Sequence, residues 1–152
     1  MFAKDETSTA PPHEAQLSRA IKNNPNSIIV VDDDAQICAL FEITLRMQGF
    51  AVITANSGQK ALELLDSVNP DLFIIDMAMP DMNGLDLCQM IRALPSTSKT
   101  PILMVSARYE SRMIPLVKAA GANDFIWKLT PQITLMRRIR QLLDQKSDTS
   151  TH

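Results

Sequence analysis

DLFIIDMAMPDMNG, residues 71–84, is a short apolar run that ends on a single acid and is followed by a broken loop. The run Leu72–Ile75 does not alternate polar and apolar residues, which is typical of a parallel strand covered by helices on both faces. Pro80 and Gly84 interrupt the chain before the next helix. Asp76 is therefore predicted to lie at the carboxyl end of a buried strand, the edge of an open α/β sheet where ligands bind. A single acid of this kind more often caps a strand or turn, so its interpretation depends on the rest of the chain.

Segments of strand length alternate with helical patterns along the chain. The predicted strands are residues 27–31, 50–55, 72–75, 102–105 and 123–127. The predicted helices are residues 35–48, 61–68, 85–94, a segment before Gly121, and 131–145. The fourth helix contains Pro115, which lacks a hydrogen-bond donor, so this helix is predicted to be kinked or to begin near Ile114. The alternation predicts an α/β fold with a doubly wound parallel sheet and right-handed crossovers.

The composition is that of an ordinary globular domain, with 152 residues, 45% hydrophobic and 21% charged. We expect one domain at residues 27–145, after a flexible extension at residues 1–26 and before a disordered tail at residues 146–152. The formal net charge of −2 does not favour nucleic-acid binding, and the basic last helix is interpreted as a solvated face. The sequence contains neither an apolar run of roughly 18 residues nor a signal-peptide core, so a cytoplasmic protein with no membrane role is expected.

Four of the five predicted strands end in acidic, hydroxyl or basic side chains. Asp32 and Asp33 follow the first strand, Asp76 ends the third, Ser106 the fourth and Lys128 the fifth. Parallel strands present their carboxyl ends at one edge, so these groups are predicted to converge there. Converging carboxylates repel each other unless a cation is present, and Mg²⁺ suits carboxylate and phosphate oxygens. Lys128 can balance a dianion while Ser106 donates to it. Each feature alone is often a solvated turn, a cap or a surface lysine, whereas their joint occurrence favours a phosphate site.

With these groups in place, the chain resembles the receiver domain of two-component response regulators over about residues 27–145. The motifs that carry the resemblance are IIVVDDD at residues 28–34 and FIIDMAMPDMNG at residues 73–84. The resemblance implies a flavodoxin-like (βα)5 three-layer sandwich with a five-stranded parallel sheet in the order 2-1-3-4-5. It also implies a role for each site residue: Asp32 and Asp33 as the acidic pair, with Asp33 the direct metal ligand; Asp76 as phosphoacceptor; the backbone carbonyl of Ala78 as a further Mg²⁺ ligand; Ser106 and Phe125 as switch residues; and Lys128 as the phosphate-binding lysine.

Three positions depart from the pattern of the family. Leu129 follows the lysine where the family usually has proline, often after a cis bond, and a cis bond before leucine is costly. Asn83 replaces a common acid in the turn before the third helix. Thr134 stands where one dimerising subfamily usually carries glutamate, although Asp124 and Arg138 are kept. We therefore expect a different loop after the lysine and a weakened form of that dimer.

The resemblance implies a signalling protein that is not a conventional enzyme and catalyses only its own phosphorylation and dephosphorylation. Asp76 would take a phosphoryl group from a histidine kinase with Mg²⁺. The face made by the fourth helix, fifth strand and fifth helix would then switch to control a downstream protein, and a homodimer through this face is a further possibility. Two alternatives stay open: a relay intermediate that passes the group to a histidine phosphotransfer protein, and an interaction module that works without phosphorylation. No effector domain follows in this sequence, so a stand-alone receiver is expected.

Two positions that tune the lifetime of the phosphorylated state in this family are Ala78 and Arg108 here. Ala78 has no polar group to orient a water molecule, and Arg108 is long enough to lie over the phosphoryl oxygens, although it can equally point into solvent. Slow self-dephosphorylation is therefore predicted. The single tryptophan, Trp127, is interpreted as core packing or as an anchor for a partner. Cys38 and Cys88 lack metal-ligand spacing and are predicted to be buried, reduced thiols.

A haloacid-dehalogenase-like phosphatase is the enzyme alternative. Asp32 and Asp34 have its Asp-x-Asp spacing, and Ser106 ends an apolar strand, but Gln36 stands where threonine or valine is expected. The acids after Lys128 fall in a helix end and a tail, so no later strand delivers the second acidic pair. Glycine-rich nucleotide loops are also absent from the sequence. These departures disfavour the phosphatase.

Overall fold

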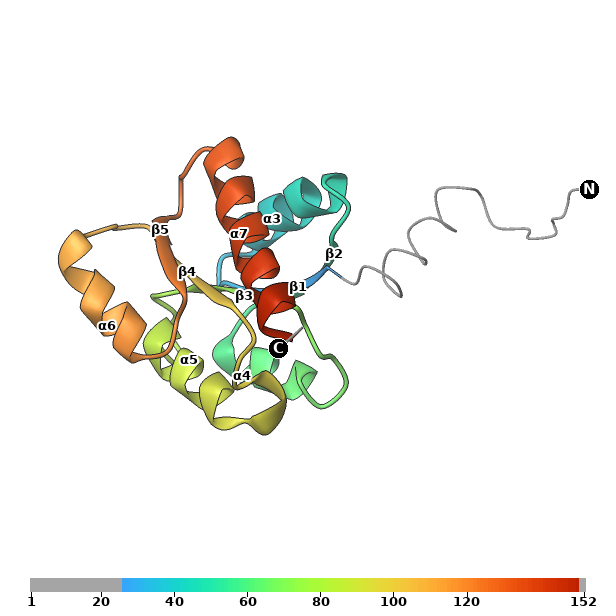
Figure 1. Ribbon diagram of the computed structural model, residues 1–152. Coiled ribbons are helices and arrows are strands. Elements are labelled where there is room, and N and C mark those ends of the chain that lie inside the picture. Colours follow the sequence, from blue (N-terminus) through green and yellow to red (C-terminus); the bar gives the residue numbers. More distant parts are fainter. Residues whose placement is uncertain (1–25, 151–152) are drawn as a thin grey trace, which may run out of the picture.

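The protein is described by a computed structural model over residues 26–150, with side chains described through residue 145. The strands are β1 (Ser27–Val31), β2 (Ala51–Ala55), β3 (Leu72–Asp76), β4 (Ile102–Ser106) and β5 (Asp124–Trp127). Neighbouring strands all pair in parallel, in the order β2-β1-β3-β4-β5 (Figure 1). The predicted strand order is therefore confirmed, and β3 is the central strand of the sheet.

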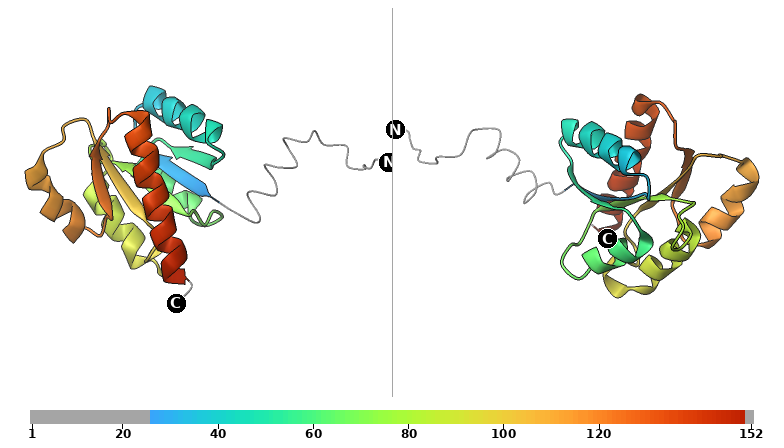
Figure 2. Two further views of the ribbon diagram at one scale, coloured as in Figure 1. Left: turned by 45° about the horizontal axis from the view of Figure 1, so that its top comes forward. Right: turned by 180° about the vertical axis from the view of Figure 1, so that it is seen from behind.

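The α-helices of the described residues are α3 (Ala35–Met47), α4 (Gly58–Leu64), α5 (Gly84–Ala93), α6 (Ile114–Ala119) and α7 (Gln132–Ser150). Two 3-10 turns, η1 (Pro95–Thr97) and η2 (Ser111–Met113), precede β4 and α6. Helices α3 and α7 cover one face of the sheet, and α4, α5 and α6 cover the other (Figures 1 and 2). This is the three-layer α/β sandwich that the sequence predicted.

Alternate residues of each strand face opposite helical layers, because side chains on a strand alternate between its two sides. Ile28 and Val30 of β1 belong to a buried cluster with residues of α3 and α7. Ile29 and Val31 belong to a second cluster with residues of α4, α5 and α6. Since both sides of the strand are buried, β1 has no polar alternation, which is why the sequence of each central strand is an unbroken apolar run.

The start of α6 agrees with the prediction from the sequence, whereas the end of α7 does not. Helix α6 begins at Ile114 with Pro115 in its first turn, where the missing donor costs no helical hydrogen bond. Helix α7 continues to Ser150, so it ends later than predicted, and residues 146–150 of the expected disordered tail are helical. The reason is that no glycine or proline interrupts residues 132–150.

The predicted extension at residues 1–26 lies outside the described residues except for Asn26. No helix in the described part of the chain is long and apolar enough to cross a membrane.

Candidate functional site

The sheet topology brings the predicted site residues to one edge. Asp76 is the last residue of the central strand β3, and Asp32 directly follows the neighbouring strand β1. On the other side, Ser106 is the last residue of β4 and Lys128 directly follows β5. Asp76 therefore occupies the middle of the edge, between the acids that follow β1 and the hydroxyl and ammonium groups supplied by β4 and β5.

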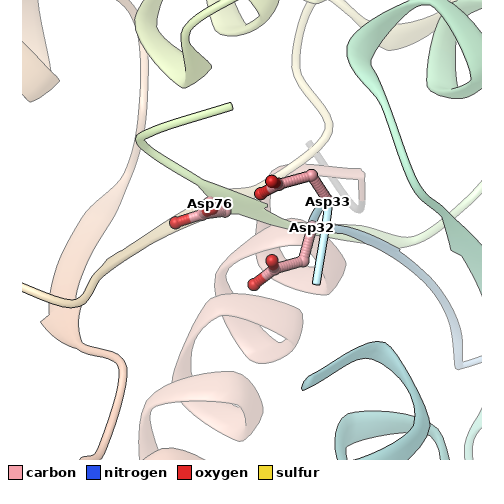
Figure 3. A group of neighbouring side chains, drawn as sticks. All are labelled: Asp32, Asp33 and Asp76. Carbon is pink, nitrogen blue, oxygen red and sulfur yellow. The ribbon is translucent and has the colours of Figure 1, made fainter. Parts of the chain in front are cut away.

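Three carboxylates form the centre of the site. Asp32, Asp33 and Asp76 each offer an oxygen, and these atoms lie within 4.8 Å of one another (Figure 3). Asp32 and Asp76 are only 1% and 4% exposed, whereas Asp33 is exposed. Asp32 Oδ1 accepts a hydrogen bond of 2.9 Å from the N–H of Asp34, and the buried Oδ2 forms an ion pair with Lys128. Three carboxylates that converge in this way offer the oxygen ligands that a hard divalent cation prefers, so this acidic pocket is able to hold a metal ion.

Lys128 supplies positive charge beside the acids. Its Nζ lies 2.7 Å from Asp32 Oδ2 and 3.5 Å from Asp76 Oδ1. Burial alone would lower the pKa of Lys128, but the short contact with Asp32 and the charges of Asp32 and Asp76 outweigh burial and raise that pKa. The lysine is therefore protonated and offsets part of the repulsion between the carboxylates. It reaches them although Leu129 replaces the usual proline and the described chain has no cis peptide bond.

The pKa of Asp76 is raised by its surroundings. Burial is the main cause, and the negative charge of Asp32 is the second, and together they raise the pKa of Asp76 from 3.8 to about 6. The charge of Lys128 and the backbone N–H of Ala78 act in the opposite direction and limit this rise. Asp76 is therefore ionised at neutral pH but under electrostatic stress, which an added cation would relieve.

The turn after β1 is held by local hydrogen bonds. Asp34 caps α3, because its Oδ1 accepts a hydrogen bond of 2.9 Å from the N–H of Gln36. One turn into α3, the Cys38 thiol donates to the carbonyl of Asp32, with 3.2 Å between sulfur and oxygen. Cys38 and Cys88 are both buried and free, as predicted, and burial raises the pKa of each thiol.

The loop from β3 to α5 is held at both of its ends. Gly84 donates its N–H to Met77 at 2.8 Å, and a Cβ at position 84 would overlap the backbone carbonyl oxygen of Asp76. The Asp81 carboxylate accepts hydrogen bonds from the N–H groups of Gly58 at 3.4 Å and Gln59 at 3.2 Å, at the start of α4. Ala78, the predicted ligand through its backbone carbonyl, lies exposed within this loop.

The predicted switch residues are arranged differently from the acids. The Ser106 hydroxyl donates to the carbonyl of Arg108 at 2.9 Å and accepts from the N–H of Arg108 at 3.1 Å. It is therefore engaged within its own loop and forms no hydrogen bond with Asp76 in this structure. Phe125 is buried and stacks with Tyr109, their ring centroids 4.8 Å apart. Arg108 is exposed.

Trp127 does not fit the interpretation as core packing, while its role as an anchor for a partner stays a prediction. It is 44% exposed, so it is not an ordinary core residue. Its indole N–H donates to the carbonyl of Ala107 at 3.3 Å, which joins β5 to the connection after β4. This contact within the chain was not predicted from the sequence.

Three further residues that shape the site escaped the sequence interpretation: Asp34, Asp81 and Tyr109. A signal existed for Asp34, because an aspartate directly before the first helical residue is a common N-cap. No sequence signal indicated the contacts of Asp81 or Tyr109. Asp81 bonds to the start of α4 and Tyr109 stacks on Phe125 of β5, and both contacts join residues that are 16 or more positions apart in the sequence. Such contacts follow only from the folded arrangement.

Comparison with known proteins agrees with this geometry. A model of the response regulator receiver domain matches residues 28–140. The chain is 36% identical over 121 residues to the "DNA-binding response regulator MtrA" of Mycobacterium tuberculosis, covering 80% of this chain and 52% of that protein. It is 39% identical over 118 residues to the "Transcriptional regulatory protein CpxR" of Escherichia coli, covering 78% and 49%. The chain thus spans about half the length of the curated relatives that it matches.

The fold comparison gives the same result. The crystallised chemotaxis protein CheY4 of Vibrio cholerae superimposes with a TM-score of 0.73 at 28% sequence identity, over 76% of this chain and 97% of that chain. In the described residues after Lys128 the chain forms α7, so the extra strand needed by the phosphatase alternative is not found there. Fold, acidic pocket and sequence matches together lead to one conclusion: the chain belongs to the receiver domain family of two-component response regulators.

Proposed function

We propose that Asp76 is the phosphoacceptor of this receiver domain and takes its phosphoryl group from a histidine kinase. The observation that carries the proposal is the position of Asp76 at the end of the central strand, with two acids on one side and Lys128 3.5 Å away on the other. Asp32 is less suited to attack, because Lys128 lies 2.7 Å from one of its oxygens and the N–H of Asp34 binds the other. Asp76 is buried and lies farther from the ammonium of Lys128 than Asp32 does, which leaves its charge less compensated.

The proposed reaction is a phosphoryl transfer between two side chains. A carboxylate oxygen of Asp76 attacks the phosphorus of a phosphohistidine, an O–P bond forms, and the P–N bond breaks with its electron pair leaving on the imidazole nitrogen. The Lys128 ammonium, held by Asp32, stands where it can balance the charge of the transferred group. The reaction changes only this protein and its phosphodonor, so the chain acts as a signalling domain that catalyses its own phosphorylation and dephosphorylation.

The acidic pocket is proposed to hold Mg²⁺. Asp32, Asp33, Asp76 and the backbone carbonyl of Ala78 would hold the ion, with Asp33 the direct ligand of the β1 pair. When bound, Mg²⁺ supplies positive charge that reduces repulsion between the Asp76 carboxylate and the phosphoryl oxygens. The convergence of three carboxylates and the raised pKa of buried Asp76 support this choice.

The response is proposed to use Ser106, Phe125 and the face formed by α6, β5 and α7. A phosphoryl oxygen on Asp76 would attract the Ser106 hydroxyl away from Arg108, and the β4–α6 connection would rearrange beside Phe125. A downstream protein or a histidine phosphotransfer protein would read this face in the cytoplasm, and the same face is the proposed homodimer surface. Asp124 and Arg138 form an ion pair within one chain, at 2.6 Å.

Labelling with a phosphodonor tests the proposal directly. The wild-type chain with Mg²⁺ and acetyl phosphate should acquire one acid-labile phosphoryl group, detected by intact mass. Asp76→Asn should acquire none, and Asp33→Ala should lose the dependence on Mg²⁺. Equal labelling of Asp76→Asn and wild type would show that the nucleophile is another residue. If wild type takes no label from any donor while it still binds a partner protein, the phosphorylation-independent interaction module is the correct function.

A further inference from the structure

The connection between β4 and α6 has little buried surface of its own. Ala107, Arg108 and Tyr109 are all exposed, although Ser106 just before them is buried. A segment that buries few apolar groups is held mainly by the individual contacts that it makes. In this protein those contacts come from the edge strand β5.

Two side chains of β5 reach the connection from the same side of the sheet. Phe125 and Trp127 are two residues apart on the strand and therefore point to the same face. The Phe125 ring stacks on Tyr109 with 4.8 Å between centroids, and the indole N–H of Trp127 donates to the carbonyl of Ala107 at 3.3 Å. The backbone adds a third contact, because the N–H of Lys128 donates to the carbonyl of Ser106 at 2.7 Å.

These contacts surround a hydroxyl group that the proposed function requires to move. A serine hydroxyl has one proton to donate, and Ser106 donates it to the carbonyl of Arg108 at 2.9 Å. The same hydroxyl accepts from the N–H of Arg108, so the turn from Ser106 to Arg108 is closed twice. Ala107 is the middle residue of this turn. To donate to a phosphoryl oxygen on Asp76, the Ser106 hydroxyl must first release the Arg108 carbonyl.

We propose that Trp127 is a positioning residue that holds this turn closed through its hydrogen bond to Ala107 and thereby sets how readily Ser106 turns toward a phosphorylated Asp76. The inference rests on the proposed function of Asp76 and adds a controlling contact to it. The indole N–H is the only donor of the tryptophan side chain, and the ring is 44% exposed, so the hydrogen bond is its specific contribution to the connection. The backbone of Trp127 pairs with Ser106 in the register of β4 and β5, so a change that removes only the indole N–H is needed to isolate the hydrogen bond to Ala107.

Removal of the N–H alone tests the proposal. Trp127→Phe keeps an aromatic ring and loses the donor, and one neutral hydrogen bond corresponds to about a 2- to 10-fold change in an equilibrium. We expect the full chain carrying Trp127→Phe to bind beryllofluoride with Mg²⁺, a phosphoryl mimic, tighter than wild type by about this factor. Calorimetry and amide chemical shifts give the affinity without tryptophan fluorescence. Met47→Ala, which changes an exposed apolar residue on α3, outside the face formed by α6, β5 and α7, is the control and should bind as wild type does.

A double-mutant cycle separates control of the hydroxyl from a general structural effect. In a Ser106→Ala background there is no hydroxyl to release, so Trp127→Phe should no longer change the affinity. An equal gain in both backgrounds, or no gain in either, would overturn the proposal. If Trp127→Phe fails to fold, benzothienylalanine at position 127 removes the N–H from a ring of nearly the same shape and should give the same gain.

The proposed function and this inference fail in different ways. If wild type shows no binding of beryllofluoride, or Asp76→Asn binds it equally well, the assignment of Asp76 is wrong and the inference falls with it. If wild type binds through Asp76 and Trp127→Phe binds with unchanged affinity, the phosphoacceptor stands and only the role of Trp127 is overturned.

Discussion

The two halves of the site are built differently. The acid half, Asp32, Asp33 and Asp76, comes from the ends of two adjacent central strands, and two of its three carboxylates are almost fully buried. The other half, from Ser106 to Tyr109, leaves the sheet after β4, is exposed beyond Ser106, and has its hydroxyl satisfied within its own turn. The difference indicates a division of labour. The buried carboxylates are fixed by the core, whereas the Ser106 hydroxyl is held only by the hydrogen bonds of its own turn.

Removal of the Lys128 ammonium should cause the largest loss of stability, because it acts on the acid half of the site. Lys128→Met keeps the length of the side chain but leaves buried Asp32 without its cation, and removal of one partner from a buried pair costs about 3–5 kcal/mol. In urea denaturation without Mg²⁺ at pH 8, we expect the free energy of unfolding to fall by this amount. The loss should be smaller at pH 5, because Asp76, with a pKa of about 6, takes up a proton there.

Arg138→Met is the matched control for that variant. It breaks the ion pair with Asp124, whose side chains are 39% and 23% exposed, so the loss should be about 1 kcal/mol or less. Equal losses for the two variants would show that the acid half is no more dependent on charge compensation than the surface.

The raised pKa of Asp76 predicts a pH-dependent instability of the metal-free protein. Between pH 3.8 and about 6 the folded chain binds more protons at Asp76 than the unfolded chain, so its contribution to stability falls as pH rises. The penalty is absent below both pKa values and complete above pH 6, where it amounts to about 3 kcal/mol.

Asp76→Asn removes the titrating carboxyl group, so the difference in free energy of unfolding between the variant and wild type reports the contribution of Asp76 at each pH. The variant should be more stable than wild type at pH 7.5 without Mg²⁺, and the advantage should shrink toward pH 4 in denaturation curves. Added Mg²⁺ should stabilise wild type more than the variant. An advantage that is the same at both pH values would mean that the Asp76 carboxylate is not under electrostatic stress.

Gly84 tests how closely the β3–α5 loop packs on Asp76. A Cβ there would overlap the Asp76 carbonyl and approach Met104 Cε to 2.7 Å, and the backbone cannot move away without loss of the bond to Met77. Gly84→Ala should therefore destabilise the protein by about 2 kcal/mol and slow phosphorylation. Gly58→Ala is the control, since its Cβ would meet only the flexible side chain of Met82 and should cost less.

The position of the acid half was also easier to predict from the sequence than that of the segment from Ser106 to Tyr109. The unbroken apolar runs of β1 and β3 indicate strands buried on both sides, and parallel pairing then brings Asp32 and Asp76 to one edge. Unbroken apolar runs and local stop signals were enough for that step. They were also enough for the start of α6, because proline has a strong positional preference in a helix.

What the sequence did not indicate depends on side-chain directions in the folded chain. The bond from Trp127 to Ala107 and the stack of Tyr109 on Phe125 join segments that are distant in sequence. The Ser106 hydroxyl can bond to its own turn or to a ligand, and no pattern of residue types decides between them. The end of α7 was placed too early because the amphipathic pattern fades after Leu143, although the helix continues.

The smallest predicted effect concerns the lifetime of the phosphorylated state. Ala78 and Arg108 flank the site from the loops after β3 and β4, and both are exposed. Ala78 cannot orient a water molecule for attack on phosphorus, and Arg108 is anchored to Ser106 through its backbone, which leaves its long side chain available to cover the phosphoryl oxygens. We therefore expect slow loss of the label from wild type, measured by intact mass over time after removal of the donor.

Replacement of the two residues should shorten that lifetime together. Ala78→Asn adds a polar group on the path of the attacking water, and Arg108→Glu replaces a covering cation by a group that can accept a hydrogen bond from that water. Each variant should lose its label severalfold faster than wild type, and the double variant should lose it faster than either one. Lys118→Glu, a charge reversal on α6, is the control for the change in net charge. If the double variant loses its label no faster than wild type, Ala78 and Arg108 do not limit hydrolysis of the phosphorylated state. Control of the lifetime would then belong to a separate phosphatase.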